Sequence, residues 1–339
     1  HVAAYDTAIG AYLRAPGDLF PQTATLALHK VQDLRYGENP HQYGARYQEV
    51  GGRSWWDAMV QHSGKELSYL NLFDGEAAWR LVHELGELSD QPGHAVAVIV
   101  KHANPCGVAL APDITTAYQR AFACDPMSAF GGIVALNQPV TAGVATAVAA
   151  NPIADVLIAP AYDQAALDHL GAKRRNMRVL EAPPPGLDRL MVRPVDGGLL
   201  VQEADRFLAG RHAWRVVTKT VPTPAQWSDA ELAWRICART TSNAIVLAAQ
   251  GQAVGVGAGQ QNRVDAARMA VTKAAGRAAG GAAASDAFFP FRDGLDAVVE
   301  GGVAVVIQPG RSVRDDEVIA AADEHGVAMV LTGERHFRH

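Results

Sequence analysis

A lysine, a histidine, an asparagine and a cysteine occur within six positions of the segment KHANPCGVA (101–109), directly after the apolar run HAVAVIV (94–100). Loops after strands are where α/β proteins commonly bind ligands. A histidine side chain can take or give a proton near neutral pH, and a lysine beside it can stabilise developing negative charge. Four interpretations of Lys101, His102 and their neighbours are open: a metal site, a nucleophile, an acid–base pair or only a polar turn.

Two of these interpretations have little support in the residues. A zinc deaminase requires H-x-E together with P-C-x-x-C, but His102 is not followed by such a glutamate, and the string PCGV lacks the second thiolate. Nothing beyond adjacency marks Cys106 as an activated thiol. The Asn-Pro and Gly of the segment turn the chain sharply and would hold Lys101 and His102 in fixed directions. An acid–base pair and a polar turn with a capping histidine stay open.

A second polar turn is predicted in LRYGENPHQYG (34–44), because Gly37 accepts positive φ and Asn39-Pro40 leaves the helical region. Arg35 and Tyr36 lie at its edge. Arginine offers a fork of donors that suits phosphate or carboxylate, and tyrosine offers a ring and a hydroxyl. The alternative is a solvated turn with an arginine–aromatic contact.

The segment GVGAGQQNRVDAAR (255–268) predicts a glycine-rich connection from a strand to a helix. Backbone N–H groups at such a helix start favour an anion. The third glycine of a dinucleotide fingerprint is replaced by Gln-Gln, and no acidic residue follows at the end of a second strand, so NAD binding is not expected. An anion held by Arg263 and the helix start, or a purely structural turn, remains.

Three phenylalanines and a proline cluster in SDAFFPFRDG (285–294), between Asp286 and Asp293. A buried aromatic cluster is one interpretation. The other is a slot in which planar rings stack, with an aspartate at its rim to hold the N–H groups of a heterocycle. The terminal segment GERHFRH (333–339), taken alone, is typical of a frayed tail.

The elements that must position these residues alternate between short β-rich runs and helical patterns, which indicates an α/β fold. Strands are predicted at 94–100, 244–250, 253–259, 303–308 and 327–333. A helix at 262–278 should bury the face that holds Val264, Ala267, Val271 and Ala274. A helix within 311–326 should begin with Ser312 as its cap and end on Gly326.

Composition narrows the class of protein. The chain has 339 residues, enough for about two domains, and is 49% hydrophobic and 19% charged, as expected for a soluble globular protein. No apolar run approaches the roughly 18 residues of a membrane span, and no signal peptide is evident. The net charge of -5 argues against a nucleic-acid surface. Three scattered cysteines predict no disulfide framework and favour the cytoplasm.

The clearest break is a stretch rich in proline and glycine that begins at residue 181. We therefore predict a first lobe at 20–180, a connection at 181–214 and a second lobe at 215–339. The start HVAAYDTAIGAYL predicts a short helix within 1–19. Its lack of an initiator methionine suggests a chain cut from a longer precursor, although processing or tag removal would leave the same start. The strings ACDPMSAFGGIVALN (123–137) and ASDAFFPFRDGLDAV (284–298) share an Asp followed five residues later by Phe, which suggests a duplicated α/β unit.

Together these strings resemble one family, AICAR transformylase/IMP cyclohydrolase, in its formyltransferase part. RYGENPHQ, KHANPCG, DPMSAFGG, TTSNAIVLA, GAGQQNRVDAAR, SDAFFPFRDG and GERHFRH match in order over nearly the whole chain. The separate N-terminal cyclohydrolase domain has no counterpart, and the start of the chain resembles the segment just past that domain. We therefore expect IMP cyclohydrolase activity to be absent.

The resemblance implies transfer of a formyl group from 10-formyltetrahydrofolate to the 5-amino group of AICAR. It also implies two lobes with a cytidine-deaminase-like three-layer α/β fold without zinc, and a homodimer whose active sites lie between subunits. A structural monovalent cation such as potassium occurs in some relatives. A membrane or a nucleic acid is not expected as a partner.

Roles for individual residues follow from the resemblance. His102 is the implied proton acceptor, and Lys101 stabilises the transition state at the formyl oxygen or assists protonation of the leaving group. The implied AICAR ligands are Arg35, Tyr36, Gly131, Asp155, Asn243, Arg263, Phe288 and Arg335. The implied folate contacts are Met127, Phe130, Val264, Pro290, Phe291, Asp293, Ser312 and Val313. The alternative function is a nucleotide-binding or scaffold module of the same fold that does not catalyse.

Overall fold

The computed structural model describes residues 2–13, 18–88, 93–152, 154–187 and 190–339. In the first half of the chain, residues 69–181 form a helix and two strands and then alternate helices with strands. These elements are α3 (Tyr69–Gly86), β4 (Ala95–Lys101), β5 (Asn104–Ala111), α4 (Ile114–Cys124), β6 (Ile133–Leu136), α5 (Ala142–Ala150), β7 (Val156–Ala159), α6 (Gln164–Lys173) and β8 (Arg178–Glu181).

The second half repeats this order of elements. They are α7 (Pro224–Ala238), β12 (Ile245–Ala249), β13 (Gln252–Gly257), α8 (Arg263–Ala274), β14 (Ala282–Ser285), α9 (Arg292–Val299), β15 (Val305–Gln308), α10 (Asp315–Glu324) and β16 (Ala328–Leu331). In each half the first strand pairs antiparallel with the second and the third, and the last three strands are parallel. The two halves are therefore copies of one α/β unit.

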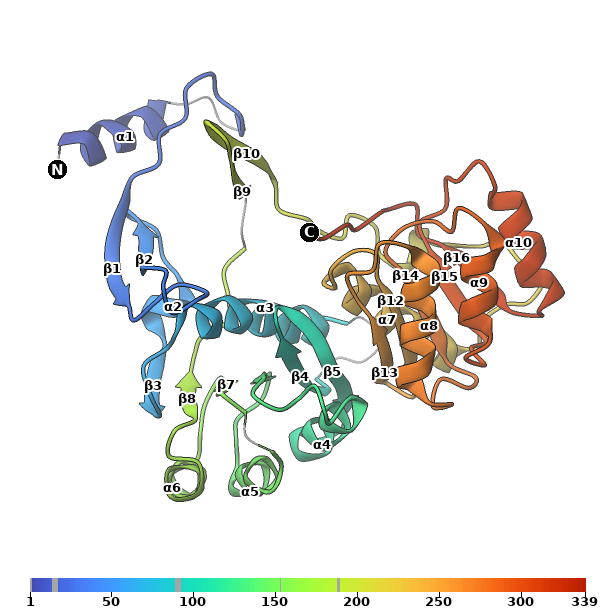
Figure 1. Ribbon diagram of the computed structural model, residues 1–339, viewed down its shortest axis with the longest axis horizontal. Coiled ribbons are helices and arrows are strands. Elements are labelled where there is room, and N and C mark those ends of the chain that lie inside the picture. Colours follow the sequence, from blue (N-terminus) through green and yellow to red (C-terminus); the bar gives the residue numbers. More distant parts are fainter. Residues whose placement is uncertain (1, 14–17, 89–92, 153, 188–189) are drawn as a thin grey trace.

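The two units join into one mixed sheet of 12 strands. Strands β3 (Val60–Ser63) and β11 (Arg215–Val216) form its edges, and the order is β11-β16-β15-β14-β12-β13-β5-β4-β6-β7-β8-β3. The central contact is the antiparallel pair β13–β5. Helices cover both faces of the sheet (Figure 1), so the three-layer α/β fold expected from the sequence is confirmed.

Alternating strand residues supply three hydrophobic cores. On one face, Val96, Val98 and Val100 of β4 belong to a core that continues under α3 and α7 through both halves. On the other face, Ala97 and Ile99 belong to a core under α4, α5 and α6, while α8, α9 and α10 cover a separate core in the second half. Because both faces are covered, the strands read as continuous apolar runs rather than alternating ones.

The duplication extends to local details of the first hairpin in each half. In β4–β5 the register shifts after the pair Ile99–Gly107, and in β12–β13 it shifts after the equivalent pair Leu247–Gly255. A Cβ atom at Gly107 would lie 2.2 Å from a carbonyl oxygen of α4, and one at Gly255 would lie 2.1 Å from a carbonyl oxygen of α8. Glycine is required at both positions because a helix backbone packs directly on the strand.

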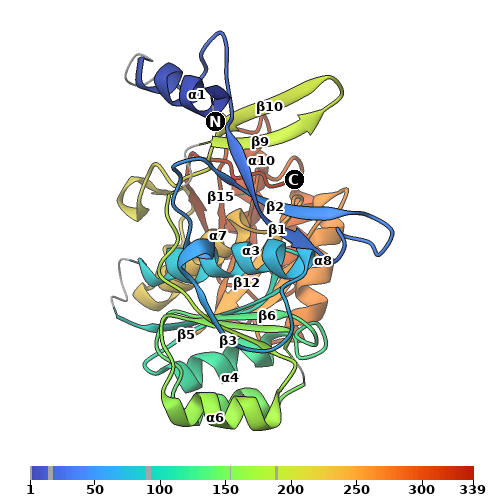
Figure 2. The ribbon, with the colours of Figure 1, turned by 90° about the vertical axis from the view of Figure 1, so that its left-hand side faces the viewer.

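Several elements lie outside the duplicated units. They are α1 (Val2–Leu13), β1 (Leu28–Leu34), β2 (Gly44–Glu49), α2 (Trp55–Ala58), β9 (Leu190–Val195), β10 (Gly198–Glu203) and a 3-10 turn, η1 (Arg211–Ala213). In both ribbon views α1 and the β9–β10 hairpin stand clear of the sheet on one side of the molecule (Figures 1 and 2). Within the described ranges no helix has the length and apolar character needed to cross a membrane.

The five predicted strands are confirmed as β4, β12, β13, β15 and β16. The predicted helix cap is wrong: α10 starts at Asp315 after Arg314, and the Ser312 hydroxyl accepts the Arg314 N–H at 3.1 Å in the preceding turn. The two strings that suggested the duplication do not occupy equivalent places in the fold. Asp125 directly follows α4, whereas Asp286 directly follows β14, so the two aspartates are not equivalent.

Candidate functional site

The segment 101–109 forms the turn between β4 and β5. Lys101 and Asn104 are the last paired residues of the two strands, and His102 and Ala103 connect them. Both connecting residues have positive φ, 51° and 55°. This is the conformation of a two-residue type I′ turn, in which Asn and Gly are usual. Because His102 and Ala103 are neither Asn nor Gly, contacts from other residues are required to hold them at positive φ.

Side chains occupy all four polar backbone groups of this turn. The carboxylate of Asp74, on α3, accepts the His102 N–H at 3.1 Å and the Ala103 N–H at 2.8 Å. The carbonyl of His102 accepts from Nδ2 of Asn104 at 3.1 Å, and the carbonyl of Ala103 accepts from Nη1 of Arg338 at 2.8 Å. The turn therefore presents the exposed His102 side chain from a fixed backbone.

The second half contains the same turn without the same chemistry. Gln250 and Gly251 connect β12 to β13 with φ of 55° and 74°, and Asp229 of α7 accepts their N–H groups at 2.9 and 2.7 Å. Gln250 stands at the position of His102, and Ala249 at the position of the lysine before it. Neither can exchange a proton near neutral pH. In the duplicated unit, the lysine–histidine pair is present only in the first copy.

At the end of β4, the Lys101 side chain extends across the strand ends toward the turn that precedes β6. Its Nζ donates to the carbonyl of Phe130 at 2.8 Å, and a Cβ atom at Gly131 would lie 3.0 Å from that nitrogen. Gly131 has φ +66°, which favours glycine. The N–H of Asp155, just before β7, donates to Gly132 at 2.9 Å. Four of the predicted residues thus gather where β4 ends and β6 and β7 begin: Lys101, Phe130, Gly131 and Asp155.

Arg263 forms a buried cluster at the start of α8. Its Nη1 donates to Oδ1 of Asp286 at 2.6 Å, and its Nη2 donates to Oδ1 of Asn243 at 2.8 Å. Nδ2 of Asn243 donates in turn to the carbonyl of Gln260 at 2.9 Å. The Arg263 side chain is only 7% exposed, and that of Asp286 is 0% exposed. In this structure Arg263 is therefore committed to internal acceptors rather than presented as an open anion site.

Hydrogen bonds connect the His102 turn to this cluster across the seam between the halves. Oδ1 of Asn104 accepts the N–H of Thr241 at 2.8 Å. The next residue, Ser242, donates its N–H to the carbonyl of Arg338 at 2.9 Å and its hydroxyl to Asp286. The turn of the first half and the Arg263–Asn243 pair of the second half are thus parts of one network.

Aromatic and apolar residues line the loops after β14, β15 and β16, whose carboxyl ends meet at one edge of the sheet. Phe288 is half-buried and Pro290 is exposed. The guanidinium of Arg314 lies 4.8 Å over the ring of Phe291, so the loop after β14 lies beside the loop after β15. The second loop presents Val313, which is fully exposed. An exposed apolar wall of this kind can stack a planar ring.

The other predicted folate contacts differ in exposure. Met127 and Phe130, in the turn before β6, are 90% and 60% exposed. Val264 is half-buried against the core under α8. Asp293 is exposed, and its Oδ1 accepts the N–H of Gly294 at 2.7 Å. Met127 and Phe130 come from the first half of the chain, and Val264 and Asp293 come from the second half.

Arg35 and Tyr36, two of the predicted nucleotide ligands, lie away from the network that joins the His102 turn to Arg263. The guanidinium of Arg35 is 4.9 Å from the ring centroid of Tyr36 and donates to its hydroxyl at 3.3 Å. The pair follows β1, which lies on the side of the first half farthest from the second half (Figure 1). Arg335 is exposed and lies 4.4 Å over the ring of Phe337. The arginine–aromatic contact considered from the sequence is thus present at 35–36.

The C-terminal segment is not a frayed tail. His336 is 2% exposed, and its Nδ1 lies 2.8 Å from a carboxylate oxygen of Asp205. Nη1 of Arg338 donates to the carbonyl of Ala103, in the turn that carries His102. Arg338 and Asp74 are functional candidates that the sequence did not reveal. Asp74 lies on the buried stripe of α3, and a carboxylate in such a stripe is a usable signal because it requires a partner.

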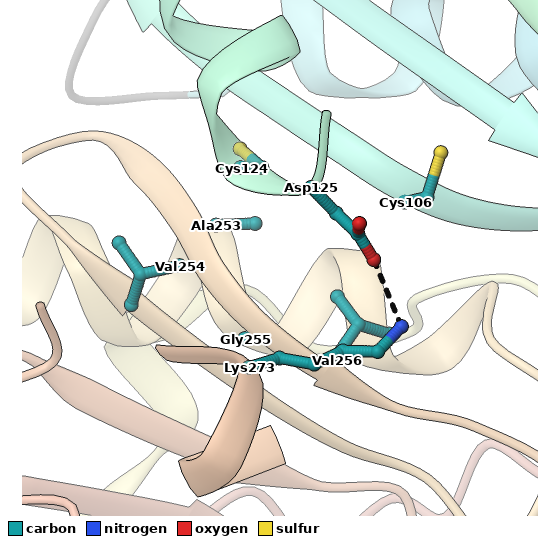
Figure 3. Close-up of a pocket in the computed structure, with 8 residues that line it drawn as sticks. All are labelled: Cys106, Cys124, Asp125, Ala253, Val254, Gly255, Val256 and Lys273. Atoms are coloured by element: carbon teal, nitrogen blue, oxygen red, sulfur yellow. Dashed lines mark hydrogen bonds and ion pairs between the residues drawn. The ribbon is translucent and has the colours of Figure 1, made fainter. Parts of the chain in front are cut away.

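The thiols near the turn do not form a reactive centre. Cys106 lines a small pocket between the halves together with Cys124, and the Asp125–Lys273 ion pair of 3.0 Å crosses it (Figure 3). Burial raises the pKa of the Cys106 thiol to about 12, which keeps it protonated near neutral pH. Across the parts of the chain that the structure describes, no three His, Cys, Asp or Glu side chains are grouped so as to hold a metal ion.

A model of one protein family matches most of this chain. The family is described as AICARFT/IMPCHase bienzyme, and the match spans residues 1–273. The matched span contains the His102 turn, Asn243 and Arg263, and it ends within α8. The aromatic loops after β14 and β15 follow it.

Proposed function

This chain belongs to the AICARFT/IMPCHase bienzyme family, and from that premise we propose that it acts as the formyltransferase. Membership gives the chain a role in purine biosynthesis. The proposed reaction moves a formyl group from 10-formyltetrahydrofolate to the 5-amino group of AICAR. The co-substrate, like a structural potassium ion, stays a prediction.

One observation carries this proposal. The adjacent Lys101 and His102 stand at a turn whose backbone is held by side chains on every side, while the duplicate turn has Ala249 and Gln250. A scaffold that only bound nucleotides would have no need of a proton-exchanging pair in one copy. The asymmetry supports a catalytic turn in the first half.

The proposed chemistry follows from these residues. The amine nitrogen of AICAR attacks the formyl carbon, a C–N bond forms, and the proton of the amine passes to His102. Lys101 stabilises the negative charge on the formyl oxygen or supplies the proton with which the folate nitrogen leaves as the C–N bond to it breaks. The amine is a weak nucleophile, so holding both substrates in place should supply much of the rate.

The binding sites are proposed on the same basis. Arginine-type donors suit the AICAR phosphate, and the exposed wall of Phe291 and Val313 suits a pterin ring. Since Arg35 and Tyr36 follow β1, far from the second half, we assign them to the site of a second copy of the chain. This assignment makes the active unit a homodimer.

The test is an assay of tetrahydrofolate release that requires both AICAR and 10-formyltetrahydrofolate, run beside an IMP-cyclisation assay. AICAR-dependent release with no cyclisation is the expected result. AICAR binding without release would instead identify a scaffold module, and cyclisation would show that the second activity of the family is present.

A further inference from the structure

We infer that Asp74 is a positioning residue for the formyl transfer, because it holds the turn that aims the imidazole of His102. The inference rests on the proposed function, since it assumes that His102 accepts the proton. Asp74 contacts the backbone of His102 and not its ring, so its effect passes through the conformation of the turn. It is distinct from all the residues that the sequence predicted for the site.

The contact is a two-point clamp from a buried helix position. Asp74 is 7% exposed, and its two oxygens accept two different amides, at 3.1 and 2.8 Å. An ionised carboxylate only accepts, so both oxygens can serve N–H donors at once. Hydrogen bonds to a charged acceptor are about twice as strong as neutral ones. A buried carboxylate also requires such partners, so the helix and the turn stabilise each other.

The conformation held by the clamp determines where the imidazole points. His102 and Ala103 both have positive φ, a region that residues with a Cβ atom rarely occupy. If the amides lost their acceptor, the turn could relax toward negative φ. The Cα–Cβ bond of His102 would then rotate away from its present direction, and the ring would move with it.

The second half supplies an internal comparison. Asp229, also buried at 6% exposure, accepts the Gln250 and Gly251 amides at 2.9 and 2.7 Å in the equivalent turn. The clamp is therefore a structural feature of both copies of the unit. Because the second turn carries no lysine–histidine pair, loss of its clamp should affect folding alone. The difference between the two variants isolates positioning from stability.

The experiment compares Asp74→Asn with Asp229→Asn in the full chain. Asparagine keeps one acceptor oxygen and places an NH2 group against the other amide. We expect kcat of Asp74→Asn to fall by about 10-fold to 100-fold, since a small displacement of a reacting group costs on that order. The KM for AICAR should stay within about threefold, because the ring and not the nucleotide site moves. Asp229→Asn should keep kcat within about threefold at a similar loss of Tm.

Hydrogen exchange of the peptide that covers residues 102 and 103 gives a readout independent of activity. Asp74→Asn should increase exchange of these amides, and Asp229→Asn should not. If the unaltered protein releases no tetrahydrofolate, the proposed function fails. In that case the exchange result still tests the clamp itself.

Equal losses of kcat in the two variants would overturn the inference, as would an unchanged kcat in an Asp74→Asn chain whose turn amides exchange freely. Should Asp74→Asn fail to fold, the substitution is made together with Ala103→Gly, because glycine accepts positive φ without strain. Compared with Ala103→Gly alone, the double variant should still lose about 10-fold to 100-fold in kcat. Equal kcat in these two chains would also overturn it.

Discussion

Arg263 and Asp286 form an ion pair of 2.6 Å whose side chains are 7% and 0% exposed. In the first half, the first residue of the equivalent helix is Ile114, and the residue after the equivalent strand is Asn137. Asn137 accepts the N–H of Val96 at 2.7 Å, so an amide–backbone bond stands where the second half has a charged pair. The two copies of the unit have thus diverged at this pair of equivalent positions, which adjoins the His102 turn only in the second half.

Removal of one partner of this pair should destabilise the protein strongly. Arg263→Met would leave the Asp286 carboxylate buried without its counter-charge, and we expect the free energy of unfolding to fall by about 3–5 kcal/mol. Urea denaturation measures this change. The exposed pair Arg314–Glu317 is the control, because Arg314→Met should cost about 1 kcal/mol or less. Equal losses in the two variants would contradict the prediction.

Replacement of His102 should remove catalysis without removing AICAR binding. For His102→Ala we expect kcat to fall by roughly 10²-fold to 10⁴-fold, the usual scale of general acid–base catalysis. The matched control is Gln250→Ala, at the equivalent turn position with φ of 55°. Its kcat should stay within about threefold of the unaltered chain. Activity of His102→Ala within that same range would show that another group accepts the proton.

A methyl group at residue 131 should displace the Lys101 amine. In Gly131→Ala the new Cβ would lie 3.0 Å from Nζ, at a φ of +66°. We expect a loss of stability of about 1 kcal/mol from the backbone conformation, together with a lower kcat. Gly326→Ala is the control, because Gly326 has φ +71° with no atom within 4 Å. For Gly326→Ala we expect a similar loss of Tm with unchanged kcat. An equal kcat in the two variants would show that Lys101 does not take part in the reaction.

A charged residue on the β9–β10 hairpin should disrupt the proposed homodimer. Leu199 and Leu200 are adjacent and 58% and 60% exposed, so both faces of the hairpin present apolar side chains. An isolated two-stranded hairpin is marginal in water and needs a cover. In light scattering after gel filtration, Leu200→Lys should shift the protein toward monomer, whereas Val221→Lys, an exposed position off the hairpin, should not. A monomeric unaltered chain would refute the homodimer.

The sequence was sufficient to predict five strands of the large sheet, β4, β12, β13, β15 and β16, because each is buried on both faces and reads as an apolar run. It also placed Lys101 and His102 at a strand end. It could not show that Asp74 and Arg338 converge on the His102 turn, because they come from segments far from that turn in the sequence and only the fold brings them together. It also could not show that Arg263 is paired internally, because burial of a charge depends on the packing of Asp286.

The Cys106 thiol should be unreactive in the folded protein. Burial raises its pKa to about 12, above the ordinary value of about 8.5, so the folded state holds the proton more tightly than the unfolded chain. The stability that this group contributes is therefore complete below about pH 8.5 and is lost as the pH rises toward about 12. At pH 8, iodoacetamide should label Cys106 roughly a thousandfold more slowly in buffer than in urea, following the thiolate fraction. Cys106→Ser identifies the labelled peptide by mass spectrometry and should retain activity. Rapid labelling in buffer would mean that the pocket of Figure 3 opens to solvent.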